Sequence, residues 1–219
     1  MAPLRFQIFA SAIVVATAWI ALAVEQTPPG VQPAEADQHR IYESGPLTLQ
    51  DFQAEVPAED GGLDAWTTSE LKFRYGYQTQ IRGRQATARI TLVDVDAVVI
   101  RDQSWNRLPQ DQELLDHEQG HFDLTQIAAL VARLYFARNR IVRTAATSER
   151  ATEMVEAELN RKMQEFIQDL KLRHEQYDRL TNHGQIASSQ RDQRRLHQQQ
   201  LDRLTRQWQD VQQAVNSRR

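Results

Sequence analysis

The sequence predicts an α+β fold in which a small antiparallel or mixed sheet packs on a set of long helices. From about residue 39 to residue 105, apolar and polar side chains alternate and Val and Ile are frequent, as in strands. After Pro109 the apolar residues recur at spacings of three, four and seven, which is the helical period. Because the strands precede the helices, α+β is favoured over alternating α/β units.

The composition excludes several classes of protein. The 219 residues contain no cysteine, which excludes disulfide scaffolds, thiol catalysis and cysteine-ligated zinc. Any bound metal must therefore be held by His, Asp, Glu or Tyr. The net charge of −3 argues against a nucleic-acid partner, since such proteins are usually basic.

The first 40 residues predict export from the cytoplasm. Residues 6–24 form an uncharged apolar run after Arg5, and Ala21-Leu22-Ala23 fits the small-x-small pattern of a cleavage site. We interpret residues 1–23 as a signal peptide, or as a signal anchor if it is not cleaved. Residues 24–40 are Pro-rich and polar and predict a flexible linker. The expected location is periplasmic or secreted, with membrane contact only through an uncleaved N-terminal segment.

Residues 41–219 are expected to form a single domain, beginning with a β-rich part at 41–108. Leu71 to Tyr77 alternate between apolar and polar side chains, which is typical of a half-buried strand. Arg82-Gly83-Arg84 predicts a turn, and the Val- and Ile-rich Ala88–Ile100 predicts one or two further strands.

Helices account for the rest of the domain. The periodicity predicts one helix from about residue 112 to 140, a break at 144–148, and a second helix from about 149 to 177. Residues 109–184 would be the catalytic helices. The tail, 185–219, carries Leu and Trp208 on a narrow stripe and predicts an amphipathic helix. We expect it to pack on its own domain; self-association through it is the alternative.

The first helix carries the residues with the clearest chemistry. His117 and His121 are separated by four positions, so both imidazoles lie on one face and can bind one zinc ion. Glu118, next to the first histidine, is placed to act as general base on a water molecule. Gly120 is costly inside a helix, which indicates a close approach of another backbone or of the metal site.

A catalytic zinc usually has a third protein ligand, and the sequence leaves its identity open. The best local context is residues 177–184, where the second helix ends and side chains can converge. A helix C-cap terminated by Gly184 is the alternative reading of this segment. The candidate ligands are Glu156, Glu158, His174, Glu175, Asp178 and His183.

Four motifs resemble those of a family of bacterial predicted secreted zinc-dependent proteases, over roughly residues 45–210. They are Leu47-Thr48-Leu49-Gln50-Asp51-Phe52, where the family usually shows a Trp that this chain lacks, Ser104-Trp105, the helix motif from Leu114 to Asp123, and Tyr177-Asp178-x-x-Thr181-x-His183-Gly184. The resemblance implies a zincin-like metallopeptidase fold with zinc bound by His117 and His121. It also implies that Glu118 and Tyr177 are catalytic and that His183 is the favoured third ligand. Asp178 and Thr181 are then alternative ligands or support the ligands from behind.

The sequence therefore predicts a secreted or periplasmic zinc endopeptidase that acts on a peptide or protein substrate. The strand at residues 89–100 is the expected edge on which an extended substrate pairs. The alternative is a non-catalytic, zinc-stabilised binding module of the cell envelope.

Overall fold

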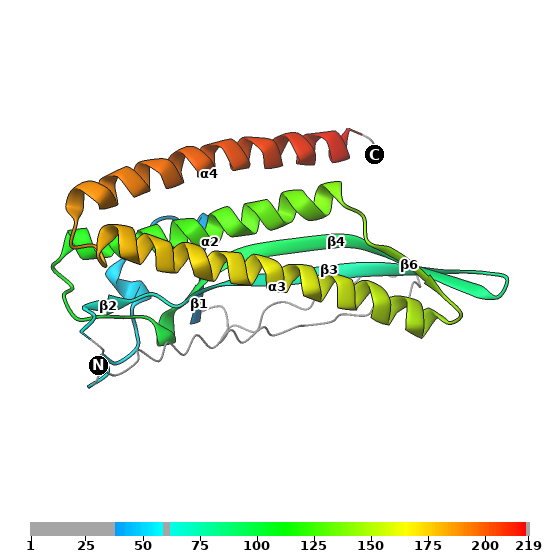
Figure 1. The fold of residues 1–219 in the computed structure, drawn as a ribbon, viewed down its shortest axis with the longest axis horizontal. Helices are drawn as coiled ribbons and strands as arrows, with labels where there is room; N and C mark the ends of the chain where they lie inside the picture. The colour runs from blue at the N-terminus through cyan, green and yellow to red at the C-terminus, as the bar shows by residue number, and fades with distance from the viewer. Residues whose placement is uncertain (1–37, 59–61, 218–219) are drawn as a thin grey trace.

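A computed structural model describes residues 38–58 and 62–217 (Figure 1). The predicted signal segment and most of the predicted linker lie outside these residues. None of the helices in the described part of the chain is long and apolar enough to cross a membrane.

The sheet is antiparallel and is built around one long hairpin, in agreement with the predicted α+β class. Strands β3 (Ser69–Arg82) and β4 (Gln85–Ile100) form this hairpin, with its turn at the predicted position. Strand β1 (His39–Ile41) pairs with the end of β4, and β6 (Val142–Ala145) pairs with its beginning. Strands β2 (Ala65–Trp66) and β5 (Trp105–Asn106) form a separate two-stranded ribbon. Short 3-10 helices span Tyr42–Ser44, Leu49–Asp51 and Arg101–Gln103.

The expectation that residues 89–100 form a free edge is wrong at both ends of the segment. On the side of β4 away from β3, Arg89 pairs with β6 and residues 98–100 pair with β1, whereas residues 90–97 pair with β3 alone. The longer free edge belongs to β3, which pairs only with β4 among the described residues. The pairing of β6 was not predicted, since the short segment after the first long helix was interpreted as a break between helices.

Three long helices follow the sheet, at positions close to those predicted. They are α2 (Gln112–Arg138), α3 (Ser148–Thr181) and α4 (Ala187–Asn216). The side chains of Asp111 and Thr147 cap the N-termini of α2 and α3 by accepting backbone N–H groups. The helices α2 and α3 cover one face of the sheet, and α4 packs on the far side of α2 (Figure 1). The molecule thus has three layers, and the tail helix packs on its own domain.

Helix α2 lies in the middle layer and forms the centre of the core. Its residues from His117 to Leu134 are almost all buried, which is expected of a helix covered by the sheet on one side and by α4 on the other. Small side chains at Ala128, Ala129 and Ala132 allow these neighbours to approach closely. The first half of this rigid helix carries the predicted metal-ligating histidines.

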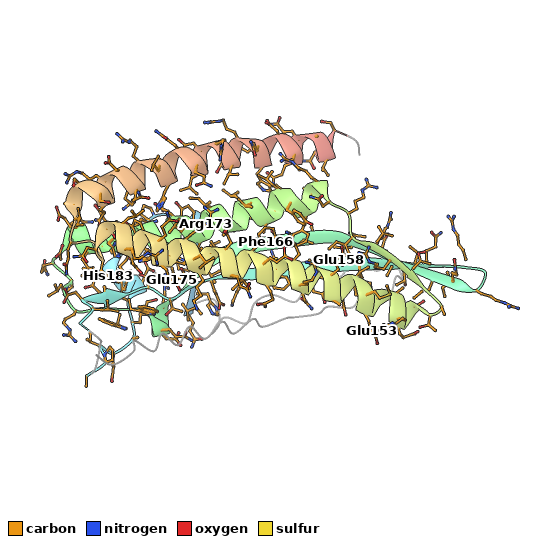
Figure 2. The ribbon with its side chains drawn as sticks, in the orientation of Figure 1. Glu153, Glu158, Phe166, Arg173, Glu175 and His183 are labelled. Atoms are coloured by element: carbon orange, nitrogen blue, oxygen red, sulfur yellow. The ribbon has the colours of Figure 1, made fainter. Side chains whose placement is uncertain are left out.

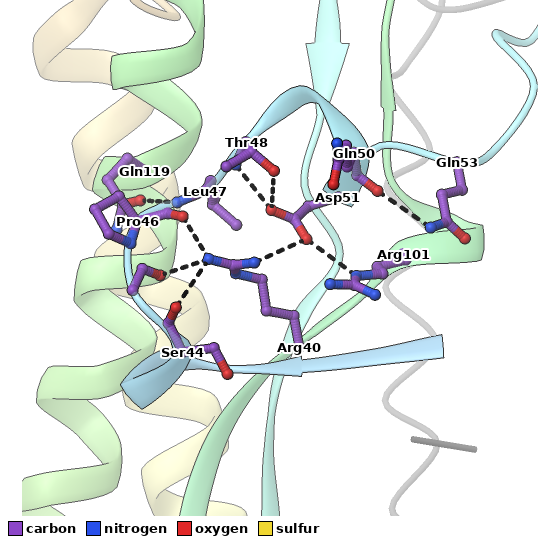
Figure 3. Close-up of polar contacts among 11 residues, drawn as sticks. Arg40, Ser44, Pro46, Leu47, Thr48, Gln50, Asp51, Gln53, Arg101 and Gln119 are labelled. Atoms are coloured by element: carbon purple, nitrogen blue, oxygen red, sulfur yellow. Dashed lines mark hydrogen bonds and ion pairs between the residues drawn. The ribbon is translucent and has the colours of Figure 1, made fainter. Parts of the chain in front are cut away.

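A buried carboxylate fixes the N-terminal segment to the sheet (Figure 3). Asp51 is 0 % exposed and accepts hydrogen bonds from the guanidinium groups of Arg40 and Arg101, at 3.4 and 3.0 Å. It also accepts from the backbone N–H and the hydroxyl of Thr48, at 2.8 and 3.0 Å, in a capping box. Beside this cluster, Leu47 donates its N–H to the side chain of Gln119 on α2 at 2.7 Å. The Leu47–Phe52 motif therefore ties β1, the end of β4 and α2 together.

We expect Asp51→Asn to lower the free energy of unfolding by about 3 kcal/mol, because two partly buried guanidinium groups lose their counter-charge. The measurement is urea denaturation of the metal-free protein. The control is Asp102→Asn, on an exposed neighbouring turn, which should change stability by no more than about 0.5 kcal/mol. Equal effects of the two substitutions would show that the Asp51 cluster has no stabilising role.

Candidate metal centre

Three side chains from two helices meet at one point. His117 and His121 come from α2, and Asp178 comes from α3. The Nε2 atoms of the two histidines are 3.3 Å apart, and they lie 3.2 and 3.0 Å from Oδ1 of Asp178. The i, i+4 spacing on α2 therefore places the imidazoles as predicted, and the packing of α3 supplies the third donor.

These distances fit a tetrahedral metal ion. Zinc lies roughly 2.0–2.1 Å from imidazole nitrogen and carboxylate oxygen, so two ligand atoms at tetrahedral vertices are about 3.3 Å apart. The three separations of 3.0–3.3 Å match this value. The donor set of two imidazoles and one carboxylate also contains only types that bind zinc. The residues therefore fit a metal ion held by three protein ligands.

Close contact between α2 and α3 sets this geometry. A Cβ atom at Gly120 would lie 2.2 Å from the hydroxyl oxygen and 2.5 Å from Cζ of Tyr177. Only glycine at this position lets the tyrosine ring lie against α2, and the ring is 2 % exposed. Because Tyr177 precedes Asp178, seating its ring brings the Asp178 carboxylate to the histidines. The close approach predicted from Gly120 is thus made by a side chain.

The ring of Tyr177 forms the rear wall of the site. It stacks on the imidazole of His117, with centroids 4.8 Å apart and an interplanar angle of 12°. Burial raises the pKa of Tyr177, so the phenol stays protonated. The side chain does not line the cleft described below. This position gives Tyr177 a packing role, and the catalytic role suggested by the sequence stays a prediction.

Electrostatics in the group favour binding of a cation. Burial lowers the pKa of His117, which keeps this imidazole neutral and able to donate a lone pair. Burial also acts to lower the pKa of His121, but the hydrogen bond to Asp178 and the negative charges of Asp178 and Glu118 raise it above its ordinary value. Burial acts to raise the pKa of Asp178, and its hydrogen bonds to both histidines outweigh this and hold the pKa well below its usual range. The carboxylate is therefore ionised, and a metal ion would compete with a proton on His121.

The other residues of the second motif shape the end of α3. Thr181 is fully buried and donates its hydroxyl to the carbonyl of Tyr177 at 2.8 Å, and it accepts the N–H of Gly184. Asn182 and His183 have positive φ angles of 48° and 52°, and Gly184 follows at 85°. A Cβ at Gly184 would lie 3.1 Å from the His117 side chain, so this turn packs directly against the first ligand. Thr181 and Gly184 thus have a structural role.

His183 lies near the group but outside it. Its Nδ1 atom is 3.7 Å from Oδ1 of Asp178, and its side chain is 48 % exposed just beyond the end of α3 (Figure 2). The three donor atoms that lie together come from His117, His121 and Asp178. The geometry therefore favours Asp178, which the sequence placed second, over His183 as third ligand. The other candidates, Glu156, Glu158, His174 and Glu175, also lie outside the donor group.

A cleft of about 680 Å³ opens over the three donors. One wall is the face of α3 that contains Ile167, Lys171 and Glu175, and the other is formed by β2 and the start of β3. Glu118 lines this cleft beside the histidines and is only 3 % exposed. No described residue forms a hydrogen bond or an ion pair with its carboxylate. A carboxylate that lines the cleft without a protein partner is available to a water molecule or a ligand in the cleft, which favours a role in function.

Sequence reasoning missed much of the cleft wall opposite α3. Trp66 and Trp105 are directly paired across the β2–β5 ribbon, and both line the cleft with Ser69. Trp105 was singled out within the Ser104-Trp105 motif, but a two-residue strand leaves no periodicity from which its pairing with Trp66 can be predicted.

A family model for a bacterial protein of unknown function (DUF922) matches residues 41–184. The chain belongs to this family. The match contains Asp51 with its partners Thr48 and Arg101 but not Arg40, and it contains the Ser104-Trp105 pair and all the residues of the candidate metal centre. The DUF922 description assigns no activity, so the chemistry must be argued from the site. No curated protein and no solved structure matches the chain.

We expect Gly120→Ala to lower the free energy of unfolding by about 1–3 kcal/mol. The added methyl group overlaps the Tyr177 ring, which outweighs the roughly 1 kcal/mol that alanine would otherwise add to a helix. Urea denaturation measures the change. The control is Gly76→Ala in β3, where the nearest atom to a new Cβ is at 3.3 Å, and which should cost less. A Gly120→Ala protein as stable as wild type would contradict the close contact.

Proposed function

We propose that the protein is a secreted or periplasmic zinc-dependent endopeptidase with a zincin-like fold. The observation that carries this proposal is the set of three donor atoms at tetrahedral separations beside a cleft that also contains Glu118. Catalytic zinc sites keep three protein ligands and one open position. The three donor residues here all line the cleft. The predicted signal segment supports the location.

The residues divide into ligands and a base. His117, His121 and Asp178 would hold the zinc ion, which supplies Lewis acidity and lowers the pKa of a coordinated water toward neutrality. Glu118 would accept a proton from water and would return it to the leaving amine. Its side chain is only 3 % exposed, and a substrate that fills the cleft would exclude bulk water from the carboxylate, which would strengthen its interaction with the reacting groups.

The dimensions of the cleft support an extended peptide substrate. Along α3, Ile167 and Asp178 both line the cleft, and eleven helical residues span roughly 16 Å. An extended peptide rises about 3.3 Å per residue. About five residues therefore fit on this side of the three donor residues His117, His121 and Asp178, which we call the metal group. The lining continues past the donors to Leu114 on α2. A substrate that extends on both sides of the site is cleaved internally, which favours an endopeptidase.

The free edge of β3 supplies the polar contacts that such a peptide needs. The carbonyl of Thr68 accepts a hydrogen bond from the N–H of Ile100. In an antiparallel pair, every second residue of a strand bonds to the neighbouring strand and the residues between them point the other way. Because Thr68 bonds to β4, Ser69 and Leu71 direct their N–H and C=O groups away from β4. Both residues line the cleft. A peptide added to this edge forms a further antiparallel or parallel strand over the metal group.

The zinc-stabilised binding module remains the competing function. A structural zinc site is usually closed by four protein ligands, and the described residues offer three in one group. Three ligands and an adjacent unpaired carboxylate favour catalysis over this alternative.

The test of the enzyme is a comparison of Glu118→Gln with Glu175→Gln. Both residues line the cleft, but only Glu118 is adjacent in the sequence to one of the three donor residues, His117. We expect wild type and both variants to bind about one zinc ion per chain, measured by elemental analysis. Hydrolysis of a mixed peptide library should fall by roughly 10²–10⁴-fold in Glu118→Gln and stay near the wild-type rate in Glu175→Gln.

Two results would contradict the proposal that the protein is a zinc endopeptidase. Wild-type protein that binds no zinc would exclude the site itself. Wild-type protein that binds zinc firmly and cleaves no peptide in the library would favour the binding module.

The identity of the third ligand is tested by Asp178→Ala and His183→Ala. Loss of a residue that only supports a ligand typically weakens metal binding by about 10–100-fold. We expect Asp178→Ala to weaken zinc binding by more than this, because it removes an oxygen that binds the metal directly. His183→Ala should bind zinc within about threefold of wild type. Competition with a chromophoric chelator measures both affinities. The reverse order would make His183 the ligand, as the sequence motif implied.

A further inference from the structure

His174 lies behind the metal group, in direct contact with one of its histidines. It precedes Asp178 by four residues on α3, so both side chains lie on the same face of the helix. Its Nδ1 atom is 2.8 Å from Nδ1 of His121, and the two rings are 5.0 Å apart between centroids. The sequence made His174 a candidate ligand. In the structure it contacts the ring of His121 on the side away from the other two donor atoms.

The contact requires a definite arrangement of protons. The Nε2 atom of His121 faces His117 and Asp178, so this nitrogen must be unprotonated to bind a metal. The proton of the neutral ring is then on Nδ1, and the atom 2.8 Å away must accept it. Nδ1 of His174 accepts only if that ring carries its own proton on Nε2.

The next contacts accommodate this arrangement. Nε2 of His174 lies 3.5 Å from Oγ1 of Thr125, at the limit of a hydrogen bond. The Thr125 hydroxyl donates to the carbonyl of His121 at 3.1 Å, so its oxygen is free to accept. The hydroxyl of Ser69 lies 2.8 Å from the same oxygen. Every donor thus has an acceptor, in a chain that runs from the metal-facing imidazole to the free edge of β3.

The two histidines of the metal group differ in this respect. Nδ1 of His117 is buried and has no hydrogen-bond partner among the described residues. That ring is held by stacking on Tyr177. Only His121 has a hydrogen-bond acceptor behind it.

We propose that His174 is a positioning residue that holds His121 in the tautomer with a free Nε2 and in the ring orientation that completes the metal site. The inference rests on the proposed metal site and adds a residue that neither the motif nor the metal group contains. Outer-shell acceptors of this kind orient metal-bound imidazoles and raise their basicity.

The test compares three substitutions of His174 in the full chain. The amide oxygen of His174→Asn takes the place of Nδ1 as acceptor, whereas the longer side chain of His174→Gln places its amide near the position of Nε2. His174→Leu removes all polar atoms. We expect zinc affinity, measured with a competing chelator, to stay within about threefold in His174→Asn and to fall roughly 10–100-fold in His174→Gln and His174→Leu.

A second readout follows the tautomer directly. Nitrogen NMR of the imidazoles in zinc-loaded protein should show the His121 proton on Nδ1 in wild type and in His174→Asn. His197→Leu is the matched control, since His197 is also buried but contacts Tyr177 instead of His121. It should bind zinc as wild type does, whatever its effect on stability.

The outcomes separate this inference from the proposed function. If wild type binds no zinc, the metal site fails and the inference fails with it. If wild type binds zinc and folded His174→Leu binds equally well, the positioning role is wrong while the metal site stands. If His174→Leu does not fold, the Asn and Gln variants decide: equal affinities for these two would overturn the acceptor role.

Discussion

The candidate site depends on one steric contact, between the Tyr177 ring and the Cα of Gly120. Two packed helices are normally separated by the side chains between them, but here one position on α2 has no Cβ and admits an aromatic ring. The ring stacks on His117, and the next residue in α3 is Asp178. A single close approach therefore sets the separation of the helices, supports one histidine and delivers the carboxylate.

The surroundings of that contact are rigid for identifiable reasons. Helix α2 is covered on both sides, so the backbone that carries His117 and His121 has little freedom to shift. The Asp51 cluster fixes β1 and the end of β4, and the neighbouring Leu47 binds Gln119 on the same stretch of α2. The two histidines are thus fixed by the backbone of α2. The Tyr177 ring also supports His117, and the His174 ring supports His121. Such support is what a preorganised metal site requires.

Much of the fold could be predicted because its elements are long and strongly periodic. The hairpin turn at Gly83 and the three helices lie within a few residues of their expected bounds. The short strands could not be predicted in the same way. Two residues, as in β2, or four, as in β6, contain too little alternation to be distinguished from a loop. This omission hid the pairing of β6 with residues 86–89 of β4, and the longer free edge belongs to β3.

The sequence by itself determined the parts of the site that depend on local geometry. The positions of His117, Glu118 and His121 on one helix follow from the helical period. The presence of Gly120 inside that helix indicated a close contact. Only the tertiary structure decided what lies opposite them. His174 and Asp178 on α3 and His183 in the turn after it are close together in the sequence and chemically plausible as ligands, so spacing could not rank them. Their rank depends on the angle and distance at which α3 crosses α2, and that packing directs Asp178 to the metal group, His174 to the back of His121 and His183 toward solvent.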